Sequence, residues 1–234
     1  NGSFARPEPA ASDETPNSST DLNGFNSVSF IGALRVQNEL KVDDGNGNLI
    51  AVDGKGIKVG VIDTGVDYTH AMFGGEGTEE AFRRNDPATV EEGTFPTAKV
   101  VGGVDLVGKT FNSASPNFAD HLPKQDADPL DDGSHGTHVA GTIAGVGDGV
   151  ETYSGVAPSA DLYAIKVFGA DGSTGDAIII RALEYAADPN GDLTLEDQLD
   201  LVNLSLGSSF GIPHILYSEA MKNLVNAGTL ALCS

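Results

Sequence analysis

The sequence predicts an α/β protein built around a mostly parallel sheet, and three observations support this fold class. Short apolar runs alternate with segments of helical periodicity, which is the pattern of repeated βαβ units. A chain of 234 residues buries a substantial core. Its 30 glycines suit tight turns and close backbone contacts. We therefore expect right-handed connections and a functional face at the carboxyl ends of the strands.

The first segment, residues 1–27, is rich in Ser, Asn, Pro, Thr and Asp. Such a composition cannot bury a core, so we interpret this segment as a flexible arm or linker. The folded domain is then expected at residues 28–234. At its start, apolar positions within 31–40 predict a short helix, and residues 43–48 form a turn by their residue types.

The rest of the domain alternates strands and helices. Continuous apolar runs predict buried strands, and helical periodicity predicts helices between them. The predicted strands are 57–62, 99–104, 162–168, 201–205 and 229–232. The predicted helices are 136–146, 174–187 and 213–226. Asp63 therefore lies where a strand ends, and His135 lies where a helix begins.

The charge of the chain argues against two classes of partner. With 13 basic and 34 acidic residues, the formal net charge is −21. Nucleic acids and anionic membrane surfaces both repel such a chain, so we expect neither as a partner. No apolar run is long enough to span a bilayer, which predicts no membrane insertion. The single cysteine, Cys233, allows no internal disulfide.

Asp63 and His135 are the candidate catalytic residues. A carboxylate at a strand end can accept a hydrogen bond from an imidazole and hold its tautomer. A histidine at a helix start lies at the positive end of the helix dipole, which favours the neutral ring that takes a proton from a hydroxyl. Considered singly, Asp63 is also interpreted as a turn residue, and His135 as a packed structural histidine.

Weaker signals lie elsewhere in the chain. We interpret His138 as a buried or supporting residue, because it follows His135 on the same small-residue helix. The remaining histidines belong to no motif, and we expect them at the surface: His70, His121 and His214. No cluster has zinc-ligand spacing. The strand end at 203–208 either presents backbone groups to an extended peptide or is an ordinary strand-to-loop transition.

Three motifs, taken in order, resemble those of the subtilisin-like serine peptidases, or subtilases. They are Ile-Asp-Thr-Gly at 62–65, His-Gly-Thr-His-Val-Ala-Gly-Thr at 135–142 and Asn-Leu-Ser-Leu-Gly at 203–207. The acidic segments 125–130 and 188–192 are similar to those of large secreted bacterial subtilases that carry a protease-associated domain. The resemblance extends over residues 28–234.

This resemblance implies a three-layer αβα sandwich and a serine endopeptidase that works through a Ser-His-Asp triad and an acyl-enzyme. Asp63 would be the triad acid and His135 the triad base. Ser205, Leu206 and Gly207 would line the substrate groove and pair with the substrate backbone. The resemblance also implies a peptide or protein substrate, a monomer, and a secreted or cell-envelope location.

Two motifs of the resembled family do not occur in the chain. These are the nucleophile motif Gly-Thr-Ser-Met-Ala and the Ala-Gly-Asn segment that supplies an oxyanion-hole donor. We expect both, with the remainder of the sheet, to lie beyond Ser234, so these 234 residues alone are predicted to be inactive. The alternative is a non-catalytic peptide-binding protein or an inactive remnant on the same fold. A dinucleotide-binding enzyme is disfavoured, since no Gly-x-Gly-x-x-Gly links a strand to a helix.

The expected chemistry requires no cofactor, but calcium could stabilise the fold. The resembled family often binds calcium through a His-Pro-Asp-Leu run, and Met72 stands here where the carboxylate would be. A different candidate is an alternating set that begins like an EF-hand loop: Asp188, Asn190, Asp192, Thr194 and Glu196. The competing interpretation of this set is a solvated acidic turn before a helix capped by Thr194 and Asp197.

Overall fold

The computed structural model describes residues 3–5, 23–147, 154–170, 172–207 and 215–234. The helices are α1 (Asn23–Phe30), α2 (Ala33–Glu39), α3 (Glu79–Arg84), α4 (His135–Ala144), α5 (Asp176–Ala187) and α6 (Ile215–Ala227), with 3₁₀ turns η1 (Ala71–Phe73) and η2 (Phe118–His121). The strands are β1 (Ser3–Ala5), β2 (Lys41–Asp43), β3 (Leu49–Ala51), β4 (Lys58–Asp63), β5 (Val100–Asp105), β6 (Asp161–Lys166), β7 (Ser173–Gly175), β8 (Leu201–Leu204) and β9 (Leu230–Cys233).

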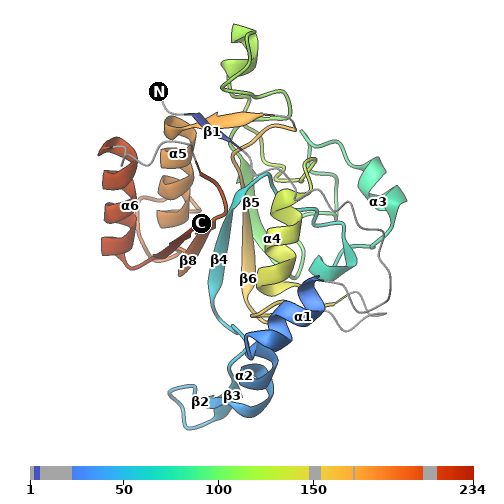
Figure 1. Ribbon diagram of the computed structural model, residues 1–234, viewed down its shortest axis with the longest axis vertical. Helices are drawn as coiled ribbons and strands as arrows, with labels where there is room; N and C mark the ends of the chain where they lie inside the picture. The colour runs from blue at the N-terminus through green and yellow to red at the C-terminus, as the bar shows by residue number, and fades with distance from the viewer. Residues whose placement is uncertain (1–2, 6–22, 148–153, 171, 208–214) are drawn as a thin grey trace.

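One parallel sheet organises the described residues. Its five strands run in the order β5-β6-β4-β8-β9, and every neighbouring pair is parallel. Helix α4 covers one face of the sheet, and α5 and α6 cover the other (Figure 1). The arrangement confirms the predicted α/β class with helices on both sides of a parallel sheet.

The strands are apolar along their length because both faces of the sheet are buried. In β4, Val59 and Val61 pack on the side of α4, whereas Ile62 packs on the side of α5 and α6. Two alanines of α4, Ala140 and Ala144, are fully buried. Their small side chains bring this helix close to the sheet, so residues at its start lie near the ends of the strands.

Charged residues collect at the carboxyl edge of this sheet. Asp63 ends the central strand β4 and is in register with Lys166, which ends β6. Lys166 is in turn in register with Asp105, which ends β5. Three neighbouring strands therefore place a carboxylate, an ammonium and a second carboxylate side by side at the edge where function was expected.

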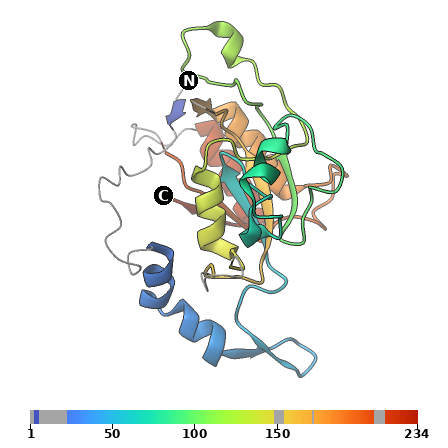
Figure 2. The ribbon, with the colours of Figure 1, turned by 90° about the vertical axis from the view of Figure 1, so that its right-hand side faces the viewer.

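Short elements surround the sheet. Helices α1 and α2 and the β2–β3 hairpin lie together at the bottom of Figure 1, and Figure 2 shows the same group from the side. The predicted turn at 43–48 joins β2 to β3, as expected. Helix α1 begins at Asn23, within the segment interpreted as an arm, and β1 pairs antiparallel with β7. The domain boundary at residue 28 stays a prediction. None of the helices in the described ranges combines the length and apolarity needed to cross a membrane.

Candidate active site

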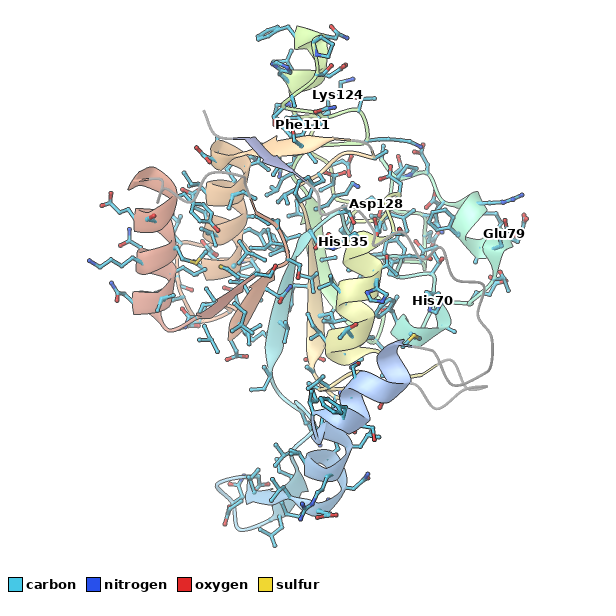
Figure 3. The ribbon with its side chains drawn as sticks, in the orientation of Figure 1. His70, Glu79, Phe111, Lys124, Asp128 and His135 are labelled. Atoms are coloured by element: carbon cyan, nitrogen blue, oxygen red, sulfur yellow. The ribbon has the colours of Figure 1, made fainter. Side chains whose placement is uncertain are left out.

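Asp63 and His135, which are 72 positions apart in the chain, form a hydrogen-bonded pair at the carboxyl edge. His135 Nδ1 lies 2.8 Å from Asp63 Oδ1 and 3.0 Å from Asp63 Oδ2. The aspartate side chain is 1% exposed and the histidine side chain 20% exposed. Figure 3 shows His135 at the end of α4 nearest the sheet edge. A buried carboxylate thus binds the Nδ1 edge of an imidazole ring that solvent still reaches.

The start of α4 is fixed by an aspartate outside the helix. The residue before the helix, Ser134, has a left-handed backbone (φ 70°) and makes no side-chain cap. Asp131 takes over this role: Oδ1 accepts the N–H groups of Gly133 and Ser134, and Oδ2 accepts both the N–H and the hydroxyl of Thr137. The carboxylate satisfies donors that a helix end otherwise leaves open, so His135 is held in the first turn.

A glycine lets α4 touch the strand end directly. Gly136 N donates to Thr64 Oγ1 at 2.8 Å. A Cβ atom added at Gly136 would lie 2.2 Å from the backbone oxygen of Gly65 and 3.1 Å from Asp63 Cβ. The 2.8 Å contact between His135 and Asp63 therefore depends on a residue without a side chain next to the histidine.

Buried acids accompany the pair. Burial raises the pKa of Asp105 to about 6, although its Oδ1 accepts two backbone N–H groups at 2.7 Å. Burial likewise raises the pKa of Asp128 to about 6. Tyr68 donates its hydroxyl to Asp128 Oδ1 at 2.8 Å, and burial together with that carboxylate raises the pKa of Tyr68. These groups lie in the core beside α4 rather than on the surface.

Sequence reasoning missed Lys166, Asp131 and the Tyr68–Asp128 pair. Lys166 is fully buried and donates to Thr64 O and to Asp132 Oδ1. A lysine at the end of an apolar run was the available signal, because such a run is otherwise buried on both faces. The contacts of the other residues join segments far apart in the sequence, which periodicity does not indicate.

The predicted substrate-binding residues follow β8, the strand next to β4. Ser205 is half-buried, and its Oγ accepts a hydrogen bond from Asn203 Nδ2. The Leu206 side chain is 5% exposed and packs in the core, so only its backbone is available to a peptide. Gly207 is exposed. The structure thus places the three beside the strand of Asp63, with their binding role still a prediction.

The remaining histidines occupy ordinary positions. His138 is exposed, and the expectation that it is buried is wrong, because it faces away from the sheet on α4. His70 is exposed and caps η1 by accepting the N–H of Met72. His121 is half-buried, with Nε2 2.7 Å from the oxygen of Ser115. His214 lies outside the described residues.

The side chains of the candidate calcium residues make hydrogen bonds within an acidic turn. Asp188 accepts three backbone N–H groups of the turn, two on Oδ1 and one on Oδ2. Asn190 Oδ1 accepts the N–H of Asp192, and Asp192 Oδ1 accepts that of Thr194. Within the described residues, no group of three or more His, Cys, Asp or Glu side chains is placed to hold a metal ion. Residues 188–194 form the expected acidic turn, but the helix expected after Thr194 is wrong, because residues 194–200 are irregular. Calcium binding stays a prediction.

Comparisons with known proteins agree with this geometry. Residues 54–234 match the subtilase family. The chain is 33% identical over 184 residues to the major intracellular serine protease of Bacillus subtilis (strain 168). It is 34% identical over 181 residues to the minor extracellular protease Vpr and 32% identical over 174 residues to subtilisin E, both of the same strain.

These similarities cover 78, 77 and 74% of this chain, but 43, 18 and 31% of the three proteins. The chain therefore spans less than half the length of these relatives. The family match nevertheless includes the strand that ends in Asp63 and the helix that begins with His135. The chain belongs to the subtilase family.

Proposed function

We propose that this chain is part of a serine endopeptidase in which Asp63 and His135 are the acid and base of a Ser-His-Asp triad. The observation that carries the proposal is the 2.8 Å contact between His135 Nδ1 and a buried Asp63 carboxylate. Hydrogen bonding to a buried carboxylate orients the ring, which is what a triad base requires. Membership of the subtilase family supports the same reaction.

The proposal gives each ring nitrogen of His135 a separate role. A carboxylate only accepts hydrogen bonds, so in a neutral His135 the ring proton is on Nδ1, which donates a hydrogen bond to Asp63. In this tautomer Nε2 is the nitrogen with the lone pair, and it can take a proton from a serine hydroxyl. Asp63 would next stabilise the imidazolium, and His135 would return the proton to the leaving amine.

The nucleophile would come from the remainder of the protein. The attacking serine and the oxyanion-hole donors complete the site in this proposal, and the described residues supply the base and its orienting carboxylate. An extended peptide would pair with the backbone of Ser205, Leu206 and Gly207 at the end of β8. We propose that the catalytic domain begins near residue 28 and that the enzyme cleaves peptides or proteins as a monomer.

We further propose a secreted or cell-envelope location. The name of Vpr describes an extracellular protease, whereas that of another relative describes an intracellular one. The net charge of −21 suits a highly solvated protein. Immunodetection of the protein in culture supernatant, envelope and cytosol would decide between the two locations.

A fluorophosphonate probe tests the enzymatic proposal. The probe labels a serine only when a neighbouring base activates it. We expect the whole gene product to be labelled on one serine, and the His135→Ala variant to lose the label. His138→Ala is the matched control, because His138 lies on the same helix but is exposed. Absence of labelling in wild type, or equal labelling of the His135 variant, would exclude the proposed mechanism.

A further inference from the structure

Lys166 occupies an unusual position for a lysine. It is the last residue of β6, between the strands that end in Asp63 and Asp105, and it is fully buried. Its Nζ donates to Thr64 O at 2.8 Å and to Asp132 Oδ1 at 2.9 Å. Burial of an ammonium is costly unless it is paired and hydrogen-bonded, and here both conditions are met.

The two acceptors belong to the two segments that hold the candidate catalytic pair. Thr64 directly follows Asp63 at the end of β4, and Asp132 precedes His135 by three residues. No covalent connection shorter than 72 residues joins Asp63 to His135. The ammonium of a third strand therefore joins the backbone beside the acid to the loop before the base.

The charge of Lys166 is needed as well as its hydrogen bonds. Asp132 is 10% exposed, and its Oδ2 is buried without a hydrogen-bond partner among the described residues. Lys166 is the counter-charge of this carboxylate. Burial raises the pKa of Asp105 and of Asp126, and the positive charge of Lys166 opposes part of that rise. A neutral side chain at 166 would leave the Asp132 carboxylate without this counter-charge.

We propose that Lys166 is a positioning residue, which sets the distance between Asp63 and His135 by tethering the β4 end to the loop before α4. Its importance for catalysis rests on the proposed function, whereas its effect on the Asp63–His135 contact does not. Lys166 acts through its side chain, whose two hydrogen bonds go to Thr64 and Asp132 and not to the catalytic residues.

Lys99 provides a matched control. It is also buried, at 8% exposure, and its Nζ also donates to two partners, Pro158 O and Ala160 O. Those carbonyls precede β6 at the opposite end from Lys166. The substitutions Lys99→Met and Lys166→Met each remove a buried ammonium with two acceptors, but only the second removes a tether between the catalytic segments.

The test compares kcat and KM of the whole gene product on a soluble peptide, with the folded fraction of each variant measured beforehand. We expect Lys166→Met to lower kcat about 10- to 100-fold with KM within threefold, as a small misplacement of reacting groups does. We expect Lys99→Met to keep kcat within threefold. A Lys166→Met enzyme with normal kcat, or an equal loss in Lys99→Met, would overturn the proposal.

Two further measurements keep the outcome decisive. If Lys166→Met does not fold, Asp132→Ala removes both the counter-charge and the hydrogen-bond acceptor of Lys166, and an unchanged kcat in that variant would refute the tether. If the wild-type protein hydrolyses no peptide, the proposed function fails. The low-field NMR signal of the His135 Nδ1 proton, which reports its hydrogen bond to Asp63, then tests the tether without any activity. We expect this signal in wild type and in Lys99→Met, but not in Lys166→Met. A signal that persists in Lys166→Met contradicts the inference.

Discussion

Replacement of Gly136 by alanine tests how closely α4 must approach β4. The new Cβ would lie 2.2 Å from the backbone oxygen of Gly65, with Asp63 Cβ and Thr64 Oγ1 each at 3.1 Å. The nearest atom belongs to the backbone, so no side-chain rotation relieves the contact. Because non-bonded carbon and oxygen atoms need roughly 3.2 Å or more, the helix start must move by about 1 Å.

This displacement reaches the proposed catalytic pair, because His135 is the residue next to Gly136. Its 2.8 Å contact with Asp63 would lengthen to about 3.8 Å, beyond hydrogen-bond range. We expect the strain to cost about 1–3 kcal/mol of the free energy of unfolding. We expect kcat/KM of the whole gene product to fall about 100-fold, as for other misplacements of this size.

Gly141 supplies the control in the same helix. An alanine Cβ there would lie 3.9 Å from Phe73 and 4.0 Å from Met72, which is ordinary contact. Gly141→Ala should therefore stabilise the helix by about 0.5–1 kcal/mol and leave kcat/KM unchanged. Urea unfolding and peptide hydrolysis measure the two quantities. If Gly136→Ala matches Gly141→Ala in stability and activity, the argument from close approach is refuted.

Three further predictions concern Asp105, Asp131 and Asp188. Burial raises the folded-state pKa of Asp105 from 3.8 to about 6, so its contribution to stability is greatest below pH 4 and declines by about 3 kcal/mol as the pH rises through 6. Urea unfolding across this pH range should show the decline in wild type but not in Asp105→Asn. Parallel pH profiles of the two proteins would contradict the prediction. Asp131→Ala should cost about 1–3 kcal/mol in the same assay, because four hydrogen bonds at the start of α4 lose their acceptor, and an unchanged midpoint would show that the cap is dispensable. Calcium or a chelator should shift the melting temperature by less than about 1 °C, since Asp188 is engaged by backbone N–H groups; a rise of several degrees with calcium would show that the turn binds it.

The sheet could be predicted from the sequence because a parallel strand covered on both faces is a continuous apolar run. Helix α3 could not. Its residues, Glu-Glu-Ala-Phe-Arg-Arg, show little amphipathic pattern, and local contacts stabilise it. Thr78 caps its first turn, and Arg83 pairs with Glu79 four residues earlier. Helix α1 was not predicted for a related reason, because it begins in a polar segment.

The residues of the candidate site likewise include some that the sequence predicted and some that it did not. Asp63 and His135 stand in short motifs, at a strand end and a helix start, where their chemistry is visible in the sequence. Lys166 stands in no such motif, and its burial depends on Asp132, 34 positions earlier in the chain. Asp131 caps the start of α4, whereas Ser134, directly before the helix, makes no side-chain cap. Such residues are defined by tertiary contacts, which local patterns do not contain.

The triad assignment is tested by the kcat/KM of the whole gene product on a peptide substrate, with and without the His135 side chain. We expect hydrolysis by wild type and a loss of at least about 10³-fold in His135→Ala, because the base is removed while the fold is kept. His138→Ala should hydrolyse the peptide at the wild-type rate. Hydrolysis by the His135 variant within tenfold of wild type would contradict the assignment of Asp63 and His135 as the catalytic pair.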